Sequence, residues 1–258
     1  MSDDLVPYLQ RPLAPVDPAL LIAIGSGPMD PADAVALSDL DRLLDPAPLA
    51  VETGWCTLPD GVGYVAVRTE MPGVSAEMVD WWFDWHPRNP DRYRIWHPLA
   101  HRANSLEQPA TPGGKPHWGA VHHPVEDVGV GMLRARIEFR RPSEVGFSTD
   151  ALDLPQVGTV VAGFAGDDAR RAQSTVMVHV FLNERGGLVL RSHFWLGAAI
   201  RPYGALGAAG QLLLNNRLAR RALLPSGLPP ALARHCCEEY ANLAGLLPEL
   251  YTQYGATE

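Results

Sequence analysis

ALARHCCEEYANLAGLL, residues 231–247, is predicted to form the long final helix around which the rest of the fold is organised. Its His235 and Glu239 stand four residues apart, so at about 3.6 residues per turn both side chains point to one side. Such a pair can bind a divalent metal, but a catalytic zinc site takes about three protein ligands and a water. The other ligands must therefore come from elsewhere in the chain. The alternative is a solvated polar pair on an exposed helix.

Alternating apolar and polar residues predict an antiparallel sheet before this helix. In MLRARIEFRR, residues 132–141, every second side chain is apolar, as expected of a strand with one buried face. Further strands are expected at 157–166 and at 174–198, the latter with a turn at 184–187, and a helical segment is expected at 204–224. The sequence therefore predicts an α+β fold in which a curved antiparallel sheet wraps around the long C-terminal helix and encloses a cavity.

Earlier in the chain, a hairpin and short helices are predicted. Residues 53–70 are interpreted as a hairpin, and residues 75–86 and 90–96 as two short helices that end or begin at prolines. A third helical turn is expected to carry His101 and Asn104 on one side, three residues apart. The helical elements of this part are thus expected to be inserted before the main strands.

The N-terminal residues 1–50 are rich in proline, aspartate and alanine and are predicted to be an appendage to a main domain of residues 51–258. A short helical pattern lies at 30–45. Its apolar positions must cover something, and the main domain and a dimer partner are equally compatible with the pattern.

Composition and charge exclude several classes of function. The 258-residue chain is long enough to bury a sizeable core. Its formal net charge of −8, without a lysine- or arginine-rich block, argues against nucleic acid as a partner. An apolar run of transmembrane length is missing and the start is acidic, so no membrane association and a cytoplasmic location are expected. The three cysteines lack disulfide or zinc-ribbon spacing and are interpreted as reduced.

Nine histidines supply candidates to complete a metal site with His235 and Glu239. Two histidines and two glutamates would be a suitable zinc site, because zinc accepts both neutral imidazoles and carboxylates. The candidates outside the final helix are His101, His122, His123, Glu126, His179 and His193. The last two lie in strands, where either can face a cavity or solvent. His86 and His97 each precede a proline and are expected to stack against tryptophans.

A wider pattern resembles the 2,4-diacetylphloroglucinol hydrolase family, to which phloretin hydrolase also belongs. The matching residues are Tyr93, His101, Asn104, Glu126 and the His235-x-x-x-Glu239 pair. The surrounding DWWFDWHPRNPDRYRIWHPLAH, residues 80–101, is similar to the aromatic and His-Pro-rich segment of that family. The resemblance covers residues 55–250, whereas the first fifty residues match poorly.

This resemblance implies a fold, a reaction and a set of roles. It implies a helix-grip fold similar to that of Bet v 1-like plant pathogenesis-related proteins, and a homodimer with N-terminal contacts. It implies hydrolysis of the carbon-carbon bond between an acyl group and a polyhydroxylated phenol ring, by a retro-Claisen route on a small phenolic ketone. The implied zinc ligands are His101, Glu126, His235 and Glu239, and the implied substrate-binding groups are Tyr93 and Asn104.

One departure and two alternatives remain. The family is expected to contact its substrate with a tyrosine of the sheet, but residues 191–195 contain none, and His193 is the candidate to replace it. A carrier that binds a hydrophobic aromatic ligand without catalysis is one alternative. A metal-free polyketide cyclase on the same scaffold is the other. Stoichiometric zinc distinguishes the hydrolase, because neither alternative needs four converging ligands.

Overall fold

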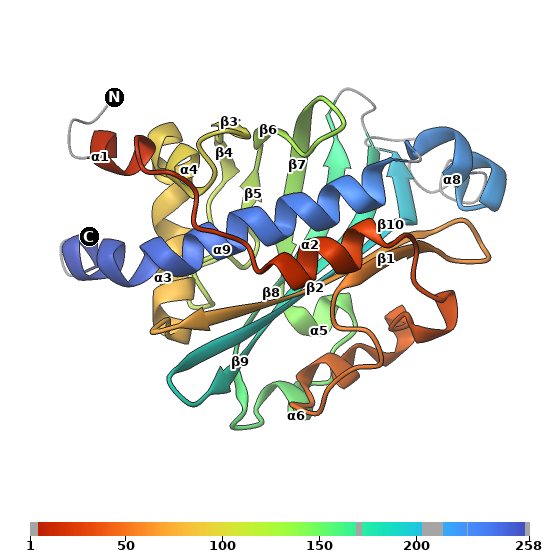
Figure 1. The fold of residues 1–258 in the computed structure, drawn as a ribbon, viewed down its shortest axis with the longest axis horizontal. Coiled ribbons are helices and arrows are strands. Elements are labelled where there is room, and N and C mark those ends of the chain that lie inside the picture. The colour runs from red at the N-terminus through yellow and green to blue at the C-terminus, as the bar shows by residue number, and fades with distance from the viewer. Residues whose placement is uncertain (1–4, 169–171, 203–213, 226, 256–258) are drawn as a thin grey trace.

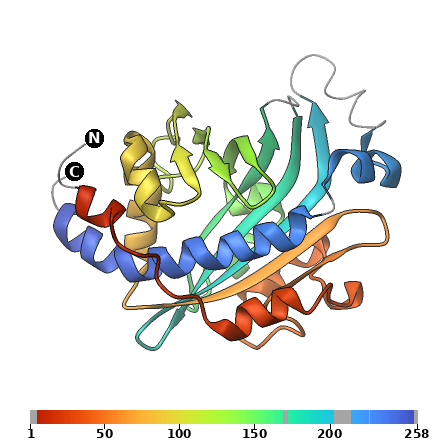
Figure 2. The ribbon, with the colours of Figure 1, turned by 45° about the horizontal axis from the view of Figure 1, so that its top comes forward.

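Helix α9 (Leu228–Tyr254) lies across a large antiparallel sheet in the computed structural model, which describes residues 5–168, 172–202, 214–225 and 227–255 (Figure 1). The strands follow the order β1-β2-β10-β9-β8-β7-β5-β4 along the main path, and β3 joins through β6. Figure 2 shows α9 running along the sheet with α2 beside it. The predicted α+β helix-grip architecture is therefore confirmed.

The strands are β1 (Gly54–Thr57), β2 (Gly63–Pro72), β3 (His101–Ala103), β4 (Leu106–Gln108), β5 (Val121–His122), β6 (Val125–Asp127), β7 (Met132–Arg140), β8 (Val157–Asp167), β9 (Ala172–Glu184) and β10 (Gly187–Pro202). The other helices are α1 (Val6–Leu9), α2 (Pro18–Gly25), α3 (Ala76–Trp85), α4 (Pro90–Trp96), α5 (Pro142–Val145), α6 (Thr149–Leu152) and α8 (Arg217–Leu223). Short 3-10 helices are η2 (Pro31–Asp33), η3 (Leu37–Leu44) and η4 (His86–Arg88).

Most of the predicted elements are present. The hairpins β1-β2 and β9-β10 and the strands β7 and β8 pair antiparallel as expected. Helix α3 begins where the Ser75 side chain accepts a hydrogen bond from the Met78 backbone N–H, and α4 begins where Asn89 caps Asp91 in the same way. Of the helical segment expected at 204–224, residues 204–213 lie outside the described residues and α8 accounts for most of the remainder.

The prediction of a third helical turn after α4, carrying His101 and Asn104, is wrong. Residues 98–100 form a turn in which the His101 N–H donates to the His97 carbonyl oxygen at 2.8 Å. The chain then becomes extended as β3, because His101 and Ala103 pair with Glu126 and Val125 of β6. A pairing partner more than twenty positions away thus overrides the local helical spacing.

The two faces of the sheet bury different layers. On the inner face, Phe194 of β10 packs in one apolar cluster with Tyr240 and Leu247 of α9. On the outer face, Trp195 packs with Leu40 of η3. Neighbouring residues of a strand point to opposite faces, so alternate side chains of β10 pack into the inner and the outer apolar layer.

Residues 29–49 of the N-terminal part cover the outer face of the sheet, whereas α1 and α2 pack on the inner side with α9. Of the apolar positions of the 30–45 pattern, Val35, Leu40, Leu43 and Leu44 are buried there and Leu37 is half-buried. The pattern forms the short 3-10 helices η2 and η3. The Trp195 indole N–H donates to the Val35 carbonyl oxygen at 2.9 Å and fixes this layer to β10. Within the described ranges, no helix combines the length and apolar character that a membrane crossing requires.

Candidate metal centre

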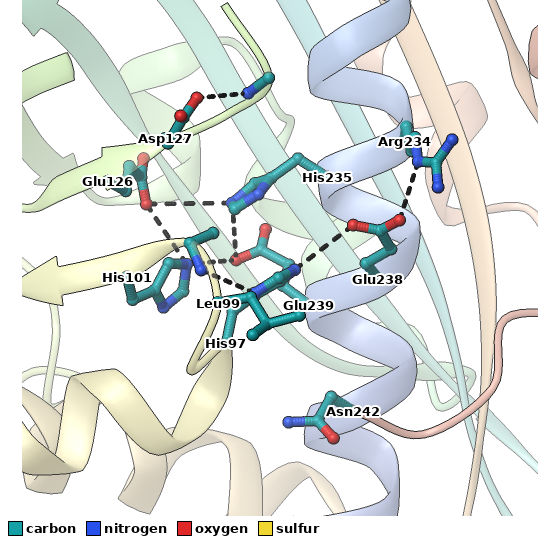
Figure 3. A network of polar contacts seen from close by, with 12 residues as sticks. His97, Leu99, His101, Glu126, Asp127, Arg234, His235, Glu238, Glu239 and Asn242 are labelled. Atoms are coloured by element: carbon teal, nitrogen blue, oxygen red, sulfur yellow. Dashed lines mark hydrogen bonds and ion pairs between the residues drawn. The ribbon is translucent and has the colours of Figure 1, made fainter. Parts of the chain in front are cut away.

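Four side chains from three distant segments converge beside α9 (Figure 3). The Nε2 atom of His101 lies 3.4 Å from a carboxylate oxygen of Glu126 and 3.6 Å from one of Glu239. The Nε2 atom of His235 lies 3.7 Å from Glu239 and 4.0 Å from Glu126. Ligand atoms of His101, Glu126 and His235 all lie within 4.8 Å of one another. The structure therefore brings together the four residues named as implied zinc ligands.

Secondary structure explains this convergence. His101 and Glu126 are paired across β3 and β6, so the antiparallel ladder sets their side chains next to each other. His235 and Glu239 are one turn apart on α9. The helix is held to α4 by hydrogen bonds from Asn242 Nδ2 to the carbonyl oxygens of Ile95 and Trp96, at 3.2 and 2.8 Å.

The His101 tautomer is set by its other ring nitrogen. Nδ1 lies 3.1 Å from the Tyr93 carbonyl oxygen, which can only accept, so Nδ1 carries the proton of the neutral ring. The lone pair of Nε2 then points toward the carboxylates. A ligating histidine is commonly oriented in this way by a hydrogen bond from its second nitrogen.

Burial controls the charges of the cluster. His101 is fully buried, and burial lowers the pKa values of His101 and His235 to about 4 each. Both imidazoles are therefore neutral near pH 7, which is the form that binds metals. Burial raises the pKa of Glu239 to about 8, with His235 opposing the shift and Glu126 adding to it. A cation at this position would provide the positive charge that the two carboxylates need.

Orphaned nitrogen atoms test whether these residues fit a metal. Nε2 of His101 and Nε2 of His235 are buried and have no hydrogen-bond partner in the described part of the chain. A buried polar atom without a partner costs free energy and is rare in native proteins. Two such atoms facing two carboxylates form a donor set that suits zinc. The residues therefore fit a divalent metal ion.

Tyr93 lies directly against the centre. Its hydroxyl donates a short hydrogen bond to Glu126, and its ring stacks on His101 with centroids 4.1 Å apart and planes 2° apart. Burial and the charge of Glu126 raise the pKa of Tyr93 well above its ordinary value. The phenol is thus held protonated beside the candidate ligands.

His97 behaves differently from the expectation that it stacks on a tryptophan. Its ring stacks on His235, with centroids 5.2 Å apart and planes 17° apart. Nδ1 accepts from the Ala100 N–H at 3.1 Å, so Nε2 carries the proton and points to Glu238 at 3.4 Å. Glu238 also accepts from Arg234 at 2.8 Å. His97 thus belongs to a layer that supports His235, whereas His86 stacks on Trp82 as expected.

Asn104 and the adjacent histidines His122 and His123 bond to residues other than the four candidate ligands. Asn104 is buried, its Nδ2 lies 3.5 Å from Nδ1 of His122, and its Oδ1 has no partner in the described residues. His123 instead lies between Glu107 and Asp168, at 2.6 and 2.7 Å. His123 is therefore engaged in ion pairs away from the centre.

His193 does not reach the centre. It pairs with Ala66 on the outer face of the sheet, and its Nδ1 lies 2.8 Å from the hydroxyl of Tyr64. The role suggested for it is therefore corrected, because the sheet separates it from α9. His179 faces inward instead: its Nδ1 lies 2.8 Å from Ser192 Oγ and its ring centroid lies 5.0 Å from that of Tyr240. Only the strand register distinguishes these two histidines.

An open hollow of about 370 Å³ adjoins the centre at one edge of α9. Its lining includes His97, Leu99, Val128, Ala231 and His235. Much of the space between α9 and the sheet, where an enclosed cavity was predicted, is filled by the apolar cluster of the inner face. The hollow at the edge of α9 is therefore the open space from which a ligand can reach the centre.

Comparison with known proteins gives several similarities. The family model described as DAPG hydrolase PhiG domain matches residues 35–252. A 2,4-diacetylphloroglucinol hydrolase of a Pseudomonas species is 31% identical over 243 residues, covering 90% of this chain and 82% of that protein. Phloretin hydrolase of Eubacterium ramulus is 28% identical over 254 residues, covering 95% and 88%. The solved structure of Ara h 8.0201 aligns with a TM-score of 0.42 and 8% identity, over 73% of this chain and 99% of that one.

Proposed function

The chain belongs to the DAPG hydrolase family, and we propose that it hydrolyses the carbon-carbon bond between an acyl group and a polyhydroxylated phenol ring. The observation that carries the proposal is the meeting of two orphaned imidazole nitrogens with two carboxylates, from His101, His235, Glu126 and Glu239. The names of the two relatives support the substrate class, since 2,4-diacetylphloroglucinol and phloretin are both acylated phloroglucinols.

The proposed cofactor is Zn²⁺, held by His101, Glu126, His235 and Glu239. Two neutral imidazoles and two carboxylates are ligands that zinc accepts, and two of the donor atoms lack any other partner among the described residues. A zinc ion bound here would supply Lewis acidity toward a carbonyl oxygen and would lower the pKa of a bound water.

The leaving group decides which proton transfer the protein must assist. An aryl carbanion is too basic to leave, so the ring carbon that bears the acyl group must first gain a proton. The phenol then becomes a β-diketone, and cleavage expels an enolate that is the product phenolate. Overall, water supplies a hydroxyl group to the acyl fragment and a hydrogen to the ring, which gives a carboxylic acid and a deacylated phenol.

Tyr93 is the side chain best placed to exchange that proton. It is buried, protonated, stacked on His101 and hydrogen-bonded to Glu126. Tyr93 has a single phenolic proton, so it must release its hydrogen bond to Glu126 when it gives that proton to the ring carbon. The ring hydroxyl loses its own proton as the β-diketone forms, and this proton restores the phenol of Tyr93. We assign Tyr93 the role of proton donor to the ring.

Asn104 is proposed to bind a phenol hydroxyl of the substrate. Its Oδ1 is buried without a partner in the described ranges, and its Nδ2 lies near His122. With the amide nitrogen directed to His122, the oxygen remains as an acceptor for an O–H donor. A ring hydroxyl is such a donor, and binding it would satisfy the orphaned oxygen.

The test is hydrolysis of a small panel of acylated phloroglucinols by zinc-loaded protein, with both products measured by chromatography. Wild type is expected to release a phenol and a carboxylic acid in equal amounts. The Tyr93→Phe variant is expected to keep its zinc and to lose about 10²–10⁴ in kcat. Full turnover by this variant would remove the proton-transfer role. Binding of the ketones without any product from wild type would favour the carrier instead of the hydrolase.

A further inference from the structure

We propose that the hollow beside the metal centre binds the acyl chain of the substrate, and that it favours 3-arylpropanoyl chains over acetyl. This inference rests on the proposed function and specifies the substrate of the same site. The relatives do not decide the point, because diacetylphloroglucinol carries acetyl groups whereas phloretin carries a 3-arylpropanoyl group. The shape and chemistry of the hollow are the observations that decide it.

The hollow is continuous with the centre along three segments. Glu126 of β6 is followed directly by Asp127, Val128 and Gly129, which line the hollow. His235 lines it as well, as do Ala231 and Arg234 on the same end of α9. His97, Leu99 and Ala100, which precede His101, form the third wall. A group bound at the centre therefore has this hollow as its neighbouring space, and Figure 3 shows these segments side by side.

The walls suit an apolar chain better than a phenol ring with several hydroxyls. Half of the lining residues, Leu99, Ala100, Val128, Gly129 and Ala231, are apolar or lack a side chain. The other half are polar: His97, Arg234 and Glu238 bond to one another, Asp127 bonds to the backbone of its own loop, and His235 belongs to the centre. Leu99, which is 71% exposed, adds apolar surface at the rim of the hollow. The groups proposed to bind the ring hydroxyls, Tyr93 and Asn104, do not line the hollow.

The size of the hollow depends on two small residues. Gly129 has a φ of +92°, and a Cβ added to it would lie 3.3 Å from the Cβ of Ala231. The loop is held by Asp127 Oδ1, which accepts from the N–H groups of Gly129 and Gly131 at 2.9 and 3.1 Å. A volume of about 370 Å³ is within the range of sites for small organic ligands and far exceeds an acetyl group.

The experiment compares monoacetylphloroglucinol with a 3-arylpropanoyl phloroglucinol. Ala231→Leu adds a side chain that narrows the hollow, and Leu99→Ala removes the exposed leucine from its rim. Leu218→Ala is the matched control, since Leu218 is 80% exposed on α8 and does not line the hollow. Zinc content and thermal unfolding of each variant show whether the fold and the centre are retained.

Ala231→Leu is expected to lower kcat/KM for the arylpropanoyl ketone by about 10-fold or more and to change the acetyl ketone by less than about twofold. Leu99→Ala is expected to lower only the arylpropanoyl value, by about three- to tenfold, because it removes apolar contact. Leu218→Ala is expected to change neither. Equal losses for both ketones, or no loss in either hollow variant, would overturn the inference.

A binding measurement separates this inference from the proposed reaction. Both ketones are titrated into wild type and Ala231→Leu while tryptophan fluorescence is followed. If wild type cleaves neither ketone, the hydrolase proposal fails. A selective loss of arylpropanoyl affinity in Ala231→Leu would still support the hollow as a chain-binding site. Unchanged relative affinities in that case would overturn the inference as well.

Discussion

The two faces of the sheet bury polar groups in opposite ways. On the outer face, Arg191 is buried, and its guanidinium donates to both carboxylate oxygens of Glu52 and to three backbone carbonyl oxygens of the N-terminal layer. On the side of α9, His101 of β3 and His235 of α9 direct toward carboxylates ring nitrogens that have no hydrogen-bond partner in the described residues. Satisfied polar groups hold the layers together, whereas converging unsatisfied ones indicate a binding site.

A single buried nitrogen without a hydrogen-bond partner does not by itself indicate a binding site. Nε2 of His193 on the outer face also has no hydrogen-bond partner in the described residues. Its ring, however, is stacked on Trp195 and bonded to Tyr64 through Nδ1. The neighbouring side chains of each histidine therefore decide whether its unpartnered nitrogen indicates a metal site. Substitutions on the outer face should affect folding stability, whereas substitutions beside α9 should affect metal binding.

The largest effect is expected from a matched pair of histidine substitutions. His101→Ala should abolish stoichiometric zinc binding and lower kcat/KM by about 10³-fold, because Lewis-acid catalysis contributes several kcal/mol. His193→Gln should keep its zinc and most of its activity, measured on the folded fraction. Zinc analysis and product assays on both proteins check this. A similar loss of zinc from both variants would contradict the assignment of the two faces.

Removing the arginine of the outer face should act on stability. Arg191→Met removes the guanidinium that donates to Glu52 and to three carbonyl oxygens, which should lower the free energy of unfolding by about 3 kcal/mol. Urea unfolding followed by circular dichroism measures this change. Zinc content of the folded protein should stay at the wild-type value. An unchanged unfolding midpoint would show that the N-terminal layer is held by apolar packing alone.

A smaller effect is expected from the layer that supports His235. Glu238→Gln weakens the acceptor of the His97 Nε2–H and of Arg234, and should lower zinc affinity by about 10-fold, the lower end of effects from residues behind the ligands. Competition with a chelator of known zinc affinity gives the Kd. Arg68→Gln, which removes the exposed pair with Glu70 elsewhere, is the control. A Kd within about twofold of wild type would exclude the supporting role of Glu238.

The smallest effect, on thermal stability, is expected for His123, whose two ring nitrogens both contact carboxylates. Burial lowers the pKa of His123, but hydrogen bonds to Glu107 and Asp168 outweigh it, and the pKa is raised overall. Charged His123 therefore stabilises the fold fully below its unfolded pKa of about 6.5, and this contribution is lost as pH rises through the raised value. The difference in Tm between wild type and His123→Gln should be larger at pH 5.5 than at pH 9. A Tm difference that increases with pH would contradict a stabilising role for charged His123.

Much of the architecture was predictable because it depends on local patterns. The period-two alternation in β7 and the prolines around α3 and α4 each specify their element without distant information. The i,i+4 spacing of His235 and Glu239 placed both on one side of α9 for the same reason. The grouping of His101 and Glu126 with this pair came from the resemblance to a family.

What the sequence left open depends on long-range pairing. His101 was expected in a helical turn, because nothing local shows that β6 will pair with it. His179 and His193 were equivalent in the sequence, and the register of β9, β10 and β2 sends one inward and the other outward. His97 was expected against a tryptophan, but its neighbour His235 arrives from α9, more than a hundred residues later.

The most direct test of the metal centre is the zinc content of the purified protein, compared with a His235→Ala, Glu239→Ala double variant prepared in parallel. Both proteins should be offered zinc, dialysed, and analysed by mass spectrometry for metal per chain. We expect about one zinc per wild-type chain and its loss from the variant. Wild-type protein that retains no zinc under these conditions would contradict the metal centre and with it the proposed hydrolase.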